Sequence, residues 1–252
     1  AQTGNECAID TSQLSQGVVG ASARSDARLK FQVVKGEMSY NYDLPGDGTP
    51  IIVPINMGDG PYTFRVMQNT SGNNYVELFS VIDNVNLSSE TAPYLVPNVF
   101  VNYNESSAVV AKARELAQGA ANQGDVVRNI YQWVVDNITY DHDKAAQLAS
   151  ATGYVPDPDA TLAAGTGICF DYASLGAAML RSLGIPCQVI TGYVSPDDVY
   201  HAWNMVYIDG EWISVEISIK PNSWTRVDLT FAASGAASTI GDGTSYTDRY
   251  TY

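Results

Sequence analysis

Residues that hold metals or form disulfides are scarce in this sequence. Its 252 residues include three cysteines, Cys7, Cys169 and Cys187, and two histidines, His142 and His201. An odd number of cysteines without a CxxC pair cannot build a disulfide framework. A zinc site would have to gather nearly all of these residues from distant segments. We therefore expect no metal and no cofactor, and a cysteine here serves either as a structural thiol or as a nucleophile.

Positive charge is also scarce. The chain has 13 Lys and Arg against 27 Asp and Glu, a formal net charge of -14, and its basic residues do not cluster. A surface for nucleic acid or for an anionic membrane needs a basic patch, so neither partner is expected. The acidic excess fits solubility or a basic partner and discriminates little between functions.

Long apolar runs are missing as well. No stretch approaches the roughly 18 apolar residues that a membrane-spanning helix needs. The first six residues, AQTGNE, have neither the basic start nor the apolar run of a signal peptide. We expect a soluble chain, already trimmed of any leader.

The first hundred residues are rich in short segments with strand composition. Tyr, Val, Ile and Phe gather in five runs separated by turn residues: 29–34, 38–44, 51–57, 62–68 and 75–82. In the second run Met38, Tyr40, Tyr42 and Leu44 alternate with polar residues, which predicts one buried and one solvated face. The pattern predicts a small all-β domain over residues 1–100 with no convergent catalytic groups. Its many tyrosines are more typical of packed sheet faces than of a carbohydrate-binding surface.

The pattern becomes helical after residue 100, where we place the boundary of a second domain, 101–252. Residues 106–118 have helical composition and end at Gly119. A second helix follows, for which Asp125 is a suitable N-cap. Its apolar residues, including Trp133, recur at helical spacing, and we expect Trp133 in the core.

The third helix of this region carries the most informative residue. From Tyr172 onward the apolar residues follow the spacing of a buried helix, and Arg181, Gly184 and Pro186 are its stop signals. Cys169 then lies at the helix N-terminus, after glycines at 165 and 167 that let the chain turn. Unsatisfied backbone N–H groups and the helix dipole stabilise a thiolate there. Cys169 is therefore a candidate nucleophile; without a GK[ST] or GxGxxG pattern, the glycines are a weak indication of a phosphate site.

The second candidate group is His201. It lies in a predicted strand, 200–208, on one face with Trp203, Met205 and Tyr207, and the Asp-Gly pair at 209–210 predicts a hairpin with a return strand over 211–217. A further strand is predicted over 224–231. A histidine 32 residues after a helix-starting cysteine, followed by acidic residues, indicates a nucleophile and base pair.

These residues resemble the transglutaminase-like superfamily, which has a papain-like Cys-His-Asp triad. The resemblance spans residues 106–232 and rests on four motifs in the family's order: 167–173 (GICFDYA), 180–186 (LRSLGIP), 201–204 (HAWN) and 209–212 (DGEW). It implies an α+β fold in which the helix carrying the cysteine packs on an antiparallel sheet. The β-rich N-terminal region is similar to secreted or surface proteins of Gram-positive bacteria, which implies an extracellular or cell-surface location.

The resemblance implies roles for three side chains. Cys169 would be the nucleophile and His201 the general base, with Asp228 as the acid that orients the imidazole. Glu216 is the alternative third member, because a hairpin turn at 209–210 pairs residue 208 with 211 and sets Glu216 on the diagonal of His201. Asp228 is preferred because its sequence context fits the family better, although Leu229 stands where relatives have proline.

The implied reaction is acyl transfer from an amide of a protein or peptide substrate through a thioester, ending in cross-linking to an amine or in hydrolysis. The backbone N–H of Cys169 is a natural oxyanion donor, and the sequence names no second one. Cys187 is expected to be a buried strand thiol, His142 a solvated loop residue, and Asp171 a first-turn residue that needs no catalytic role.

A catalytically inactive surface or scaffold protein with the same fold is the rival hypothesis. Met205, where relatives often have glutamate, and Leu229 are the departures that support it. An inactive protein would have a Cys169 no more reactive than Cys187. The role of Cys7 is open between a free and an intermolecular thiol.

Overall fold

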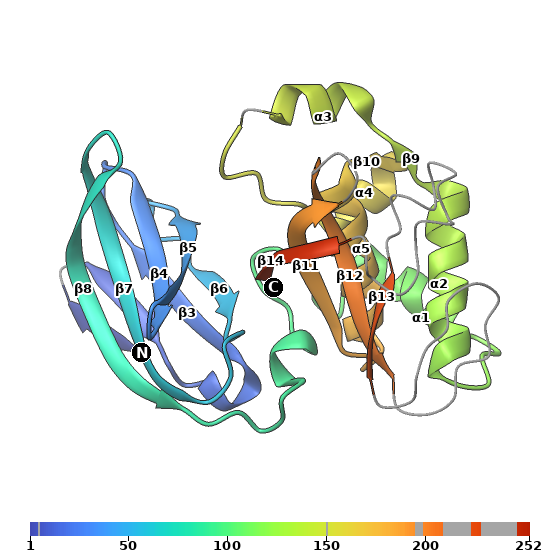
Figure 1. Cartoon of the computed structure of the whole chain (residues 1–252), viewed down its shortest axis with the longest axis horizontal. Coiled ribbons are helices and arrows are strands. Elements are labelled where there is room, and N and C mark those ends of the chain that lie inside the picture. Colours follow the sequence, from blue (N-terminus) through green and yellow to red (C-terminus); the bar gives the residue numbers. More distant parts are fainter. Residues whose placement is uncertain (5, 150, 195–198, 209–222, 228–245) are drawn as a thin grey trace. The chain divides into compact units, whose positions relative to one another are not determined.

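The computed structural model describes residues 1–4, 6–149, 151–194, 199–208, 223–227 and 246–252 (Figure 1). The described chain divides into two compact units, Ala1–Val99 and Phe100–Tyr252. The first unit is built from strands and two short 3-10 helices, and the second from helices and a sheet. The α+β class predicted from the sequence is confirmed.

The N-terminal unit contains two four-stranded antiparallel sheets. One sheet has the order β1, β2, β3, β6, with bounds Gln2–Gly4, Cys7–Asp10, Val18–Ala23 and Ile51–Pro54. The other has the order β5, β4, β7, β8, with bounds Met38–Leu44, Leu29–Lys35, Gly60–Ser71 and Asn74–Val85. The 3-10 helices are η1 (Leu14–Gln16) and η2 (Ala92–Tyr94).

Alternation along the strands decides which side chains form the core of this unit. Phe31 on β4 and Phe64 on β7 are fully buried, and their rings stack with centroids 6.5 Å apart. In β5 the expected alternation buries Tyr40, Tyr42 and Leu44. Met38, at the start of the strand, was expected to be buried with them, but it is 52% exposed because the pattern fails at the open end of the sheet.

The C-terminal unit packs helices on a four-stranded antiparallel sheet of order β13, β12, β11, β14. These strands are Ser223–Val227, Val199–Ile208, Cys187–Val194 and Tyr246–Thr251. The helices are α1 (Ala108–Leu116), α2 (Gln123–Asn137), α3 (His142–Leu148), α4 (Pro158–Ala164) and α5 (Cys169–Ser182). A small parallel pair, β9 (Thr139–Tyr140) with β10 (Thr166–Gly167), lies directly before α5 in the fold.

Helix α5 is the centre of this unit. Every residue from Asp171 to Arg181 is buried, and the helix packs against β11, β12, α1, α2 and α4. Its apolar face joins the core formed with α1, α2 and the two central strands. The helix ends as expected, with Gly184 at φ +75° just past it. No helix in the described part of the chain is long and apolar enough to span a membrane.

Two predictions for this unit are wrong. Helix α2 is capped by Asn122, whose side chain accepts from the Asp125 backbone N–H at 2.9 Å, and Asp125 instead lies within the first turn and accepts from the Ala121 N–H. The Asn122 side chain already accepts from the Asp125 backbone N–H, so the Asp125 side chain bonds the chain before the helix instead. His142 is exposed as expected, but it begins α3 because Asp141 caps that helix.

The predicted hairpin turn at 209–210 and its return strand over 211–217 lie outside the described residues. Among the described residues, 204–208 of β12 pair with β13, where Ile208 lies opposite Ser223 and Asn204 opposite Val227. Residues 204–206 also pair with β11 on the other edge.

Candidate active site

Two glycines shape the chain before Cys169, for different reasons. Gly165 has φ +65° and closes α4, a left-handed conformation that favours glycine. Gly167 has no such conformation; a Cβ atom there would lie 2.7 Å from the Cβ of Asp171. The first glycine makes the expected turn, and the second lets the chain approach the first turn of α5.

Cys169 is the first residue of α5, as the sequence predicts. The residue before it, Ile168, is the N-cap, and its side chain has no atom that can accept a hydrogen bond from the first N–H groups of the helix. By contrast, α2, α3 and α4 are each capped by an Asn or Asp side chain. The start of α5 therefore presents backbone donors beside the thiol, and a helix N-terminus favours negative charge.

The three thiols differ in exposure. Cys7 and Cys187 are buried, whereas Cys169 is partly exposed. Burial raises the pKa of the Cys187 thiol to about 12, a rise that nearby Arg181 opposes. Burial, followed by the charge of Glu6, also raises the pKa of Cys7. Cys187 is thus the buried strand thiol predicted from the sequence, and burial of Cys7 argues against an intermolecular thiol at that position.

Asp171 has a larger role than its place in a first helical turn indicates. Its carboxylate is 0% exposed and accepts from three donors: the Ile168 N–H at 2.8 Å, Lys144 Nζ at 2.6 Å and the Tyr154 hydroxyl. The sequence analysis missed Lys144 and Tyr154, because they lie 27 and 17 residues before Asp171. No local pattern predicts such a contact.

Charge in this cluster changes the acidity of its members. Burial raises the pKa of Tyr154 to about 12, and its hydrogen bond to Asp171 acts in the same direction. Burial alone would lower the pKa of Lys144, but hydrogen bonds and charge from Asp171 and Tyr154 raise it. Lys144 Nζ also lies 4.8 Å from the centre of the Tyr154 ring. The lysine therefore stays cationic and the phenol stays protonated near neutral pH.

Tyr140 borders the same helix start. It ends β9 and pairs with Gly167 of β10, and its ring contacts that of His142 with centroids 4.9 Å apart. Burial raises the pKa of Tyr140, and the charges of Cys169 and Asp171 raise it further. Its phenol is a protonated group near the thiol.

Strand β12 carries His201 and is fixed to α5 by a buried amide. Asn204 Nδ2 donates to the carbonyl of Ala173 on α5 at 2.9 Å and to that of Gln188 on β11 at 3.1 Å. Because side chains alternate along a strand, His201 and Trp203 project from the other face, where their rings lie 6.4 Å apart. Met205 packs on that face with Trp203. At this position, where relatives often have glutamate, the chain therefore makes an apolar contact.

Contacts further along both elements show that α5 and β12 run in the same direction. The Asn204 bond reaches the second turn of the helix, and later on each element Leu180 and Val206 border one small internal cavity. The two starts therefore lie at one end of the helix and sheet pair. Cys169 stands at one of these starts, and His201, which is buried, stands near the other.

The acidic candidates fall outside the described residues. Asp228 directly follows Val227, the last residue of β13, and Glu216 belongs to the stretch between β12 and β13. The expected pairing of 208 with 211, on which Glu216 depends, also involves residues outside the described ones. Leu229 lies outside the described residues as well.

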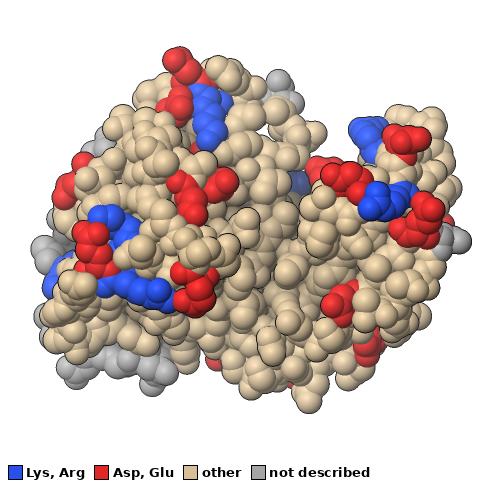
Figure 2. All heavy atoms as spheres, turned by 180° about the vertical axis from the view of Figure 1, so that it is seen from behind, with Lys and Arg blue, Asp and Glu red and all other residues tan. Residues whose placement is uncertain are grey.

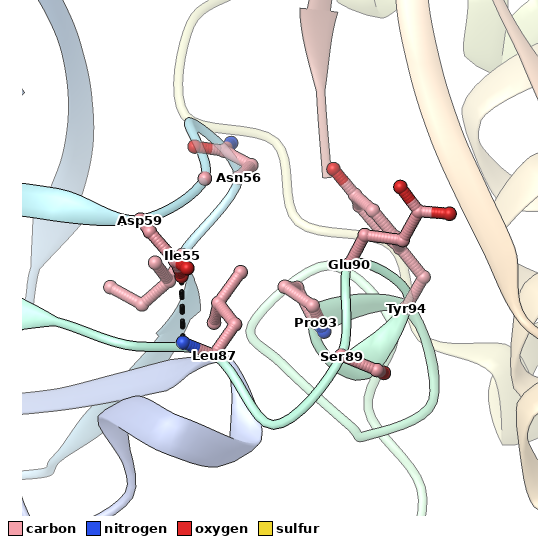
Figure 3. A pocket seen from close by; sticks show the side chains of 9 residues that line it. Ile55, Asn56, Asp59, Leu87, Ser89, Glu90, Pro93 and Tyr94 are labelled. Atoms are coloured by element: carbon pink, nitrogen blue, oxygen red, sulfur yellow. Dashed lines mark hydrogen bonds between the residues drawn. The ribbon is translucent and has the colours of Figure 1, made fainter.

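The N-terminal unit has a pocket of its own, of about 210 Å³ (Figure 3). Asp59, Glu90 and Tyr94 line it, and an Asp59 carboxylate oxygen accepts from the Leu87 N–H at 2.7 Å. Among the described residues, no group of three or more His, Cys, Asp or Glu side chains is arranged to hold a metal ion. On the face drawn in Figure 2, basic side chains lie beside acidic ones and form no basic patch among the described residues.

Comparisons with known proteins show what part of the helix and sheet unit is similar to. Residues 110–217 match the family model of the transglutaminase-like superfamily. Cytokinesis protein 3 of Schizosaccharomyces pombe is 33% identical over 120 residues, which are 42% of this chain and 12% of that protein. Kyphoscoliosis peptidase of Mus musculus is 31% identical over 112 residues, which are 40% of this chain and 16% of that protein.

A solved structure from Cytophaga hutchinsonii, provisionally described as a cysteine protease, has a TM-score of 0.47 at 15% identity and covers 94% of this chain and 79% of its own. The chain spans only a small part of the length of either curated relative. The match of residues 110–217 shows that this part of the chain is transglutaminase-like.

Proposed function

We propose that the protein is a cysteine-dependent acyltransferase or peptidase that acts on amide groups of protein or peptide substrates through a thioester. The observation that carries this proposal is the position of Cys169. It is partly exposed, begins a buried helix, and follows an N-cap residue that cannot cap that helix with its side chain. The other two thiols are buried and have raised pKa values, so they do not compete for the role.

His201 is proposed as the general base and later general acid, and Asp228 as the carboxylate that orients it. The common end of α5 and β12 supports the pairing of His201 with Cys169. The register of β13 supports Asp228. Residue 227 lies opposite Asn204, so the strand runs toward the His201 end of β12. Glu216 stays the alternative third member.

The chemistry follows from these roles. The Cys169 thiolate attacks the amide carbonyl, and backbone N–H groups at the start of α5, that of Cys169 first, donate hydrogen bonds to the developing oxyanion. The imidazolium of His201 gives its proton to the leaving amine, and a thioester remains. An amine or a water molecule, deprotonated by His201, then attacks the thioester and releases Cys169.

The test begins with iodoacetamide alkylation of each cysteine across pH 5 to 9, in the wild type and in His201→Ala. Cys169 should react fast even at the acidic end of the series and lose this reactivity in His201→Ala, because the imidazolium stabilises the thiolate. Cys187 is the matched control within the chain. Slow alkylation of Cys169 that ignores His201 would support the inactive scaffold instead.

Activity variants then assign the triad. Casein and a fluorescent primary amine report transfer, whereas new peptide ends, or ammonia released when no amine acceptor is added, report hydrolysis. Cys169→Ala should abolish both signals, and His201→Ala should lower kcat by about 10²- to 10⁴-fold. Asp228→Asn should lower kcat by about 10²-fold or more, because the imidazole loses its orientation, whereas Glu216→Gln should not. The reverse ranking of the two acid variants would make Glu216 the third member.

We also propose an extracellular or cell-surface location in a Gram-positive bacterium. Its support is the combination of a strand-built unit with a transglutaminase-like domain in one chain. Fractionation of the source cells with an antibody against the chain tests it. Recovery from the cytosol alone would refute it.

A further inference from the structure

The carboxylate of Asp171 joins three segments that are separate in the sequence. Through the Ile168 N–H it bonds the N-cap of its own helix at 2.8 Å. Through Lys144 it forms an ion pair with α3 at 2.6 Å, and through the Tyr154 hydroxyl it reaches the segment before α4. The carboxylate is 0% exposed, whereas the Lys144 side chain keeps 31% of its surface exposed. Burying a carboxylate costs free energy unless it is hydrogen-bonded and paired with a cation, so the loss of any of the three donors should be destabilising.

Helix α3 depends on this contact more than the other helices depend on polar contacts. It buries none of its residues, whereas α1, α2, α4 and α5 each contribute buried side chains. It is also only seven residues long, which is too short to be stable by itself. Its described attachments are the short β9 strand before it, the ring contact of His142 with Tyr140, the Asp141 cap, the Lys144 ion pair, and the contact of Lys144 with the Tyr154 ring. Among these, only the ion pair reaches α5.

The contact lies beside the proposed nucleophile. Asp171 is two residues after Cys169, in the same helical turn, and β9 leads from Tyr140 directly into α3. Gly167 is required for the approach of the chain to Asp171, since a Cβ at that position would lie 2.7 Å from the Cβ of Asp171. Residues 139–149 and 151–154 therefore form a wall at the start of α5, to which Asp171 bonds through Lys144 and Tyr154.

We propose that Asp171 is a positioning residue: with Lys144 and Tyr154 it locks the wall formed by residues 139–149 and 151–154 against the helix start that carries Cys169, and this wall holds the acyl substrate beside the thiol. The inference rests on the proposed function for its substrate. The lock itself is a property of the fold and can be measured without any turnover.

Hydrogen exchange of the full chain tests the lock. In Lys144→Met the backbone amides of 142–154 should exchange at least about tenfold faster than in the wild type, because α3 loses its only contact with α5 among those described. Lys112→Met is the matched control. Lys112 lies on α1, where it forms an ion pair with Glu115, and its Nζ lies over the ring of Trp133 on α2. It is not one of the donors to Asp171, so exchange of the amides of 142–154 should not change. Unchanged exchange in Lys144→Met would overturn the proposal.

A milder variant covers the case in which Lys144→Met does not fold, since it leaves the buried carboxylate short of a cation. Tyr154→Phe removes one donor without changing charge, and it should speed exchange in 151–154 while leaving the amides of α5 protected. If exchange of 151–154 is unaltered in Tyr154→Phe, the phenol does not hold the wall and the proposal fails.

Kinetics separate the lock from the proposed chemistry. With the substrate found in the activity screen, Lys144→Met should lower kcat/KM by about 10- to 100-fold, mainly by raising KM, because the wall no longer holds the substrate in place. Lys144→Arg, which keeps a cation that can bond Asp171, should restore most of KM. An equal fall of kcat with unchanged KM would contradict a substrate wall. Accelerated exchange in a protein whose wild type shows no activity would sustain the lock and refute the proposed function.

Discussion

The two units of this chain solve the problem of burial differently. The N-terminal unit buries apolar side chains almost exclusively, and eight of the nine buried polar or charged residues of the described chain lie in the C-terminal unit. The C-terminal set is Ser107, Thr161, Asp171, Ser174, Arg181, Thr191, His201 and Asn204. A buried polar group costs free energy unless it finds its partners, so each of these positions is a constraint on the fold.

Several of these buried groups form hydrogen bonds that connect separate elements. Arg181 on α5 donates to the Cys187 carbonyl at 2.8 Å and to that of Tyr252 at 2.9 Å, which fixes the helix to β11 and to the residue after β14. The Ser174 hydroxyl donates to the Phe100 carbonyl at 2.6 Å. The fold of the first unit is therefore specified by its pattern of apolar residues, whereas the fold of the second also depends on polar contacts between residues far apart in the sequence.

The largest expected effect tests whether the two units are stabilised separately. All four tryptophans, at 133, 203, 212 and 224, follow residue 100, so tryptophan fluorescence reports the C-terminal unit alone. Leu175→Ala removes a fully buried side chain of α5 and should lower the free energy of unfolding in a urea titration by about 2–5 kcal/mol. Phe64→Ala, equally buried in β7, should cost about 3–5 kcal/mol in far-UV circular dichroism and leave the tryptophan transition unmoved.

A shift of the tryptophan transition in Phe64→Ala as large as that in Leu175→Ala would contradict separate stabilisation. The two units would then unfold as one, and the difference between them would concern only which side chains they bury.

A middle-sized effect contrasts a buried amide with an exposed one. Asn204→Ala should destabilise the C-terminal unit by about 1–3 kcal/mol, since it leaves the Ala173 and Gln188 carbonyls without their donor. In the N-terminal unit, Gln32 donates to Asn41 across two strands on an exposed surface, and Gln32→Ala should change stability by no more than about 0.5 kcal/mol. Chemical denaturation of both variants measures the two losses of unfolding free energy. Equal losses would contradict the difference between a buried and an exposed amide.

The smallest effect concerns pH. In the folded protein burial raises the pKa of Cys187 to about 12, so the folded state keeps its proton where the unfolded thiol, with a pKa of about 8.5, has lost it. The stability that Cys187 contributes is thus fully present below about pH 8.5 and declines as the pH rises from there toward 12. The slope of unfolding free energy against pH, followed by tryptophan fluorescence, should become shallower in Cys187→Ala. An identical slope would show that another group controls it.

The fold was predictable where the pattern is local. The strand of residues 38–44 has the expected bounds, and α5 begins at Cys169 and stops before Gly184, because the period of apolar residues and the stop signals lie within a few residues of one another. The three short strands before residue 24 were missed, since small residues such as Ala21 and Ala23 give a weak strand signal. Asp125 was misassigned as a cap because two neighbouring residues, Asn122 and Asp125, can both cap a helix.

The candidate site was predictable only in part. A cysteine at a helix start is a local feature, and the family motifs identified both Cys169 and His201. The partners of Asp171 were not predictable, because Lys144 and Tyr154 come from a helix and a segment that carry no motif of their own. The third acidic residue stays a prediction, because a turn signal at 209–210 is local, whereas the residue that reaches His201 depends on strand pairing across the sheet.

The sequence by itself determined the two-part organisation of secondary structure, the helix that starts at Cys169, and the transglutaminase-like character of the second part. These depend on periodicity, turn residues and short motifs, which act over a few residues. Only the tertiary structure decided which strand lies beside His201, which thiols are buried, and which residues surround Asp171. Those outcomes require segments far apart in the chain to meet, and the cost of leaving a buried carboxylate or amide without partners is what fixes how they meet.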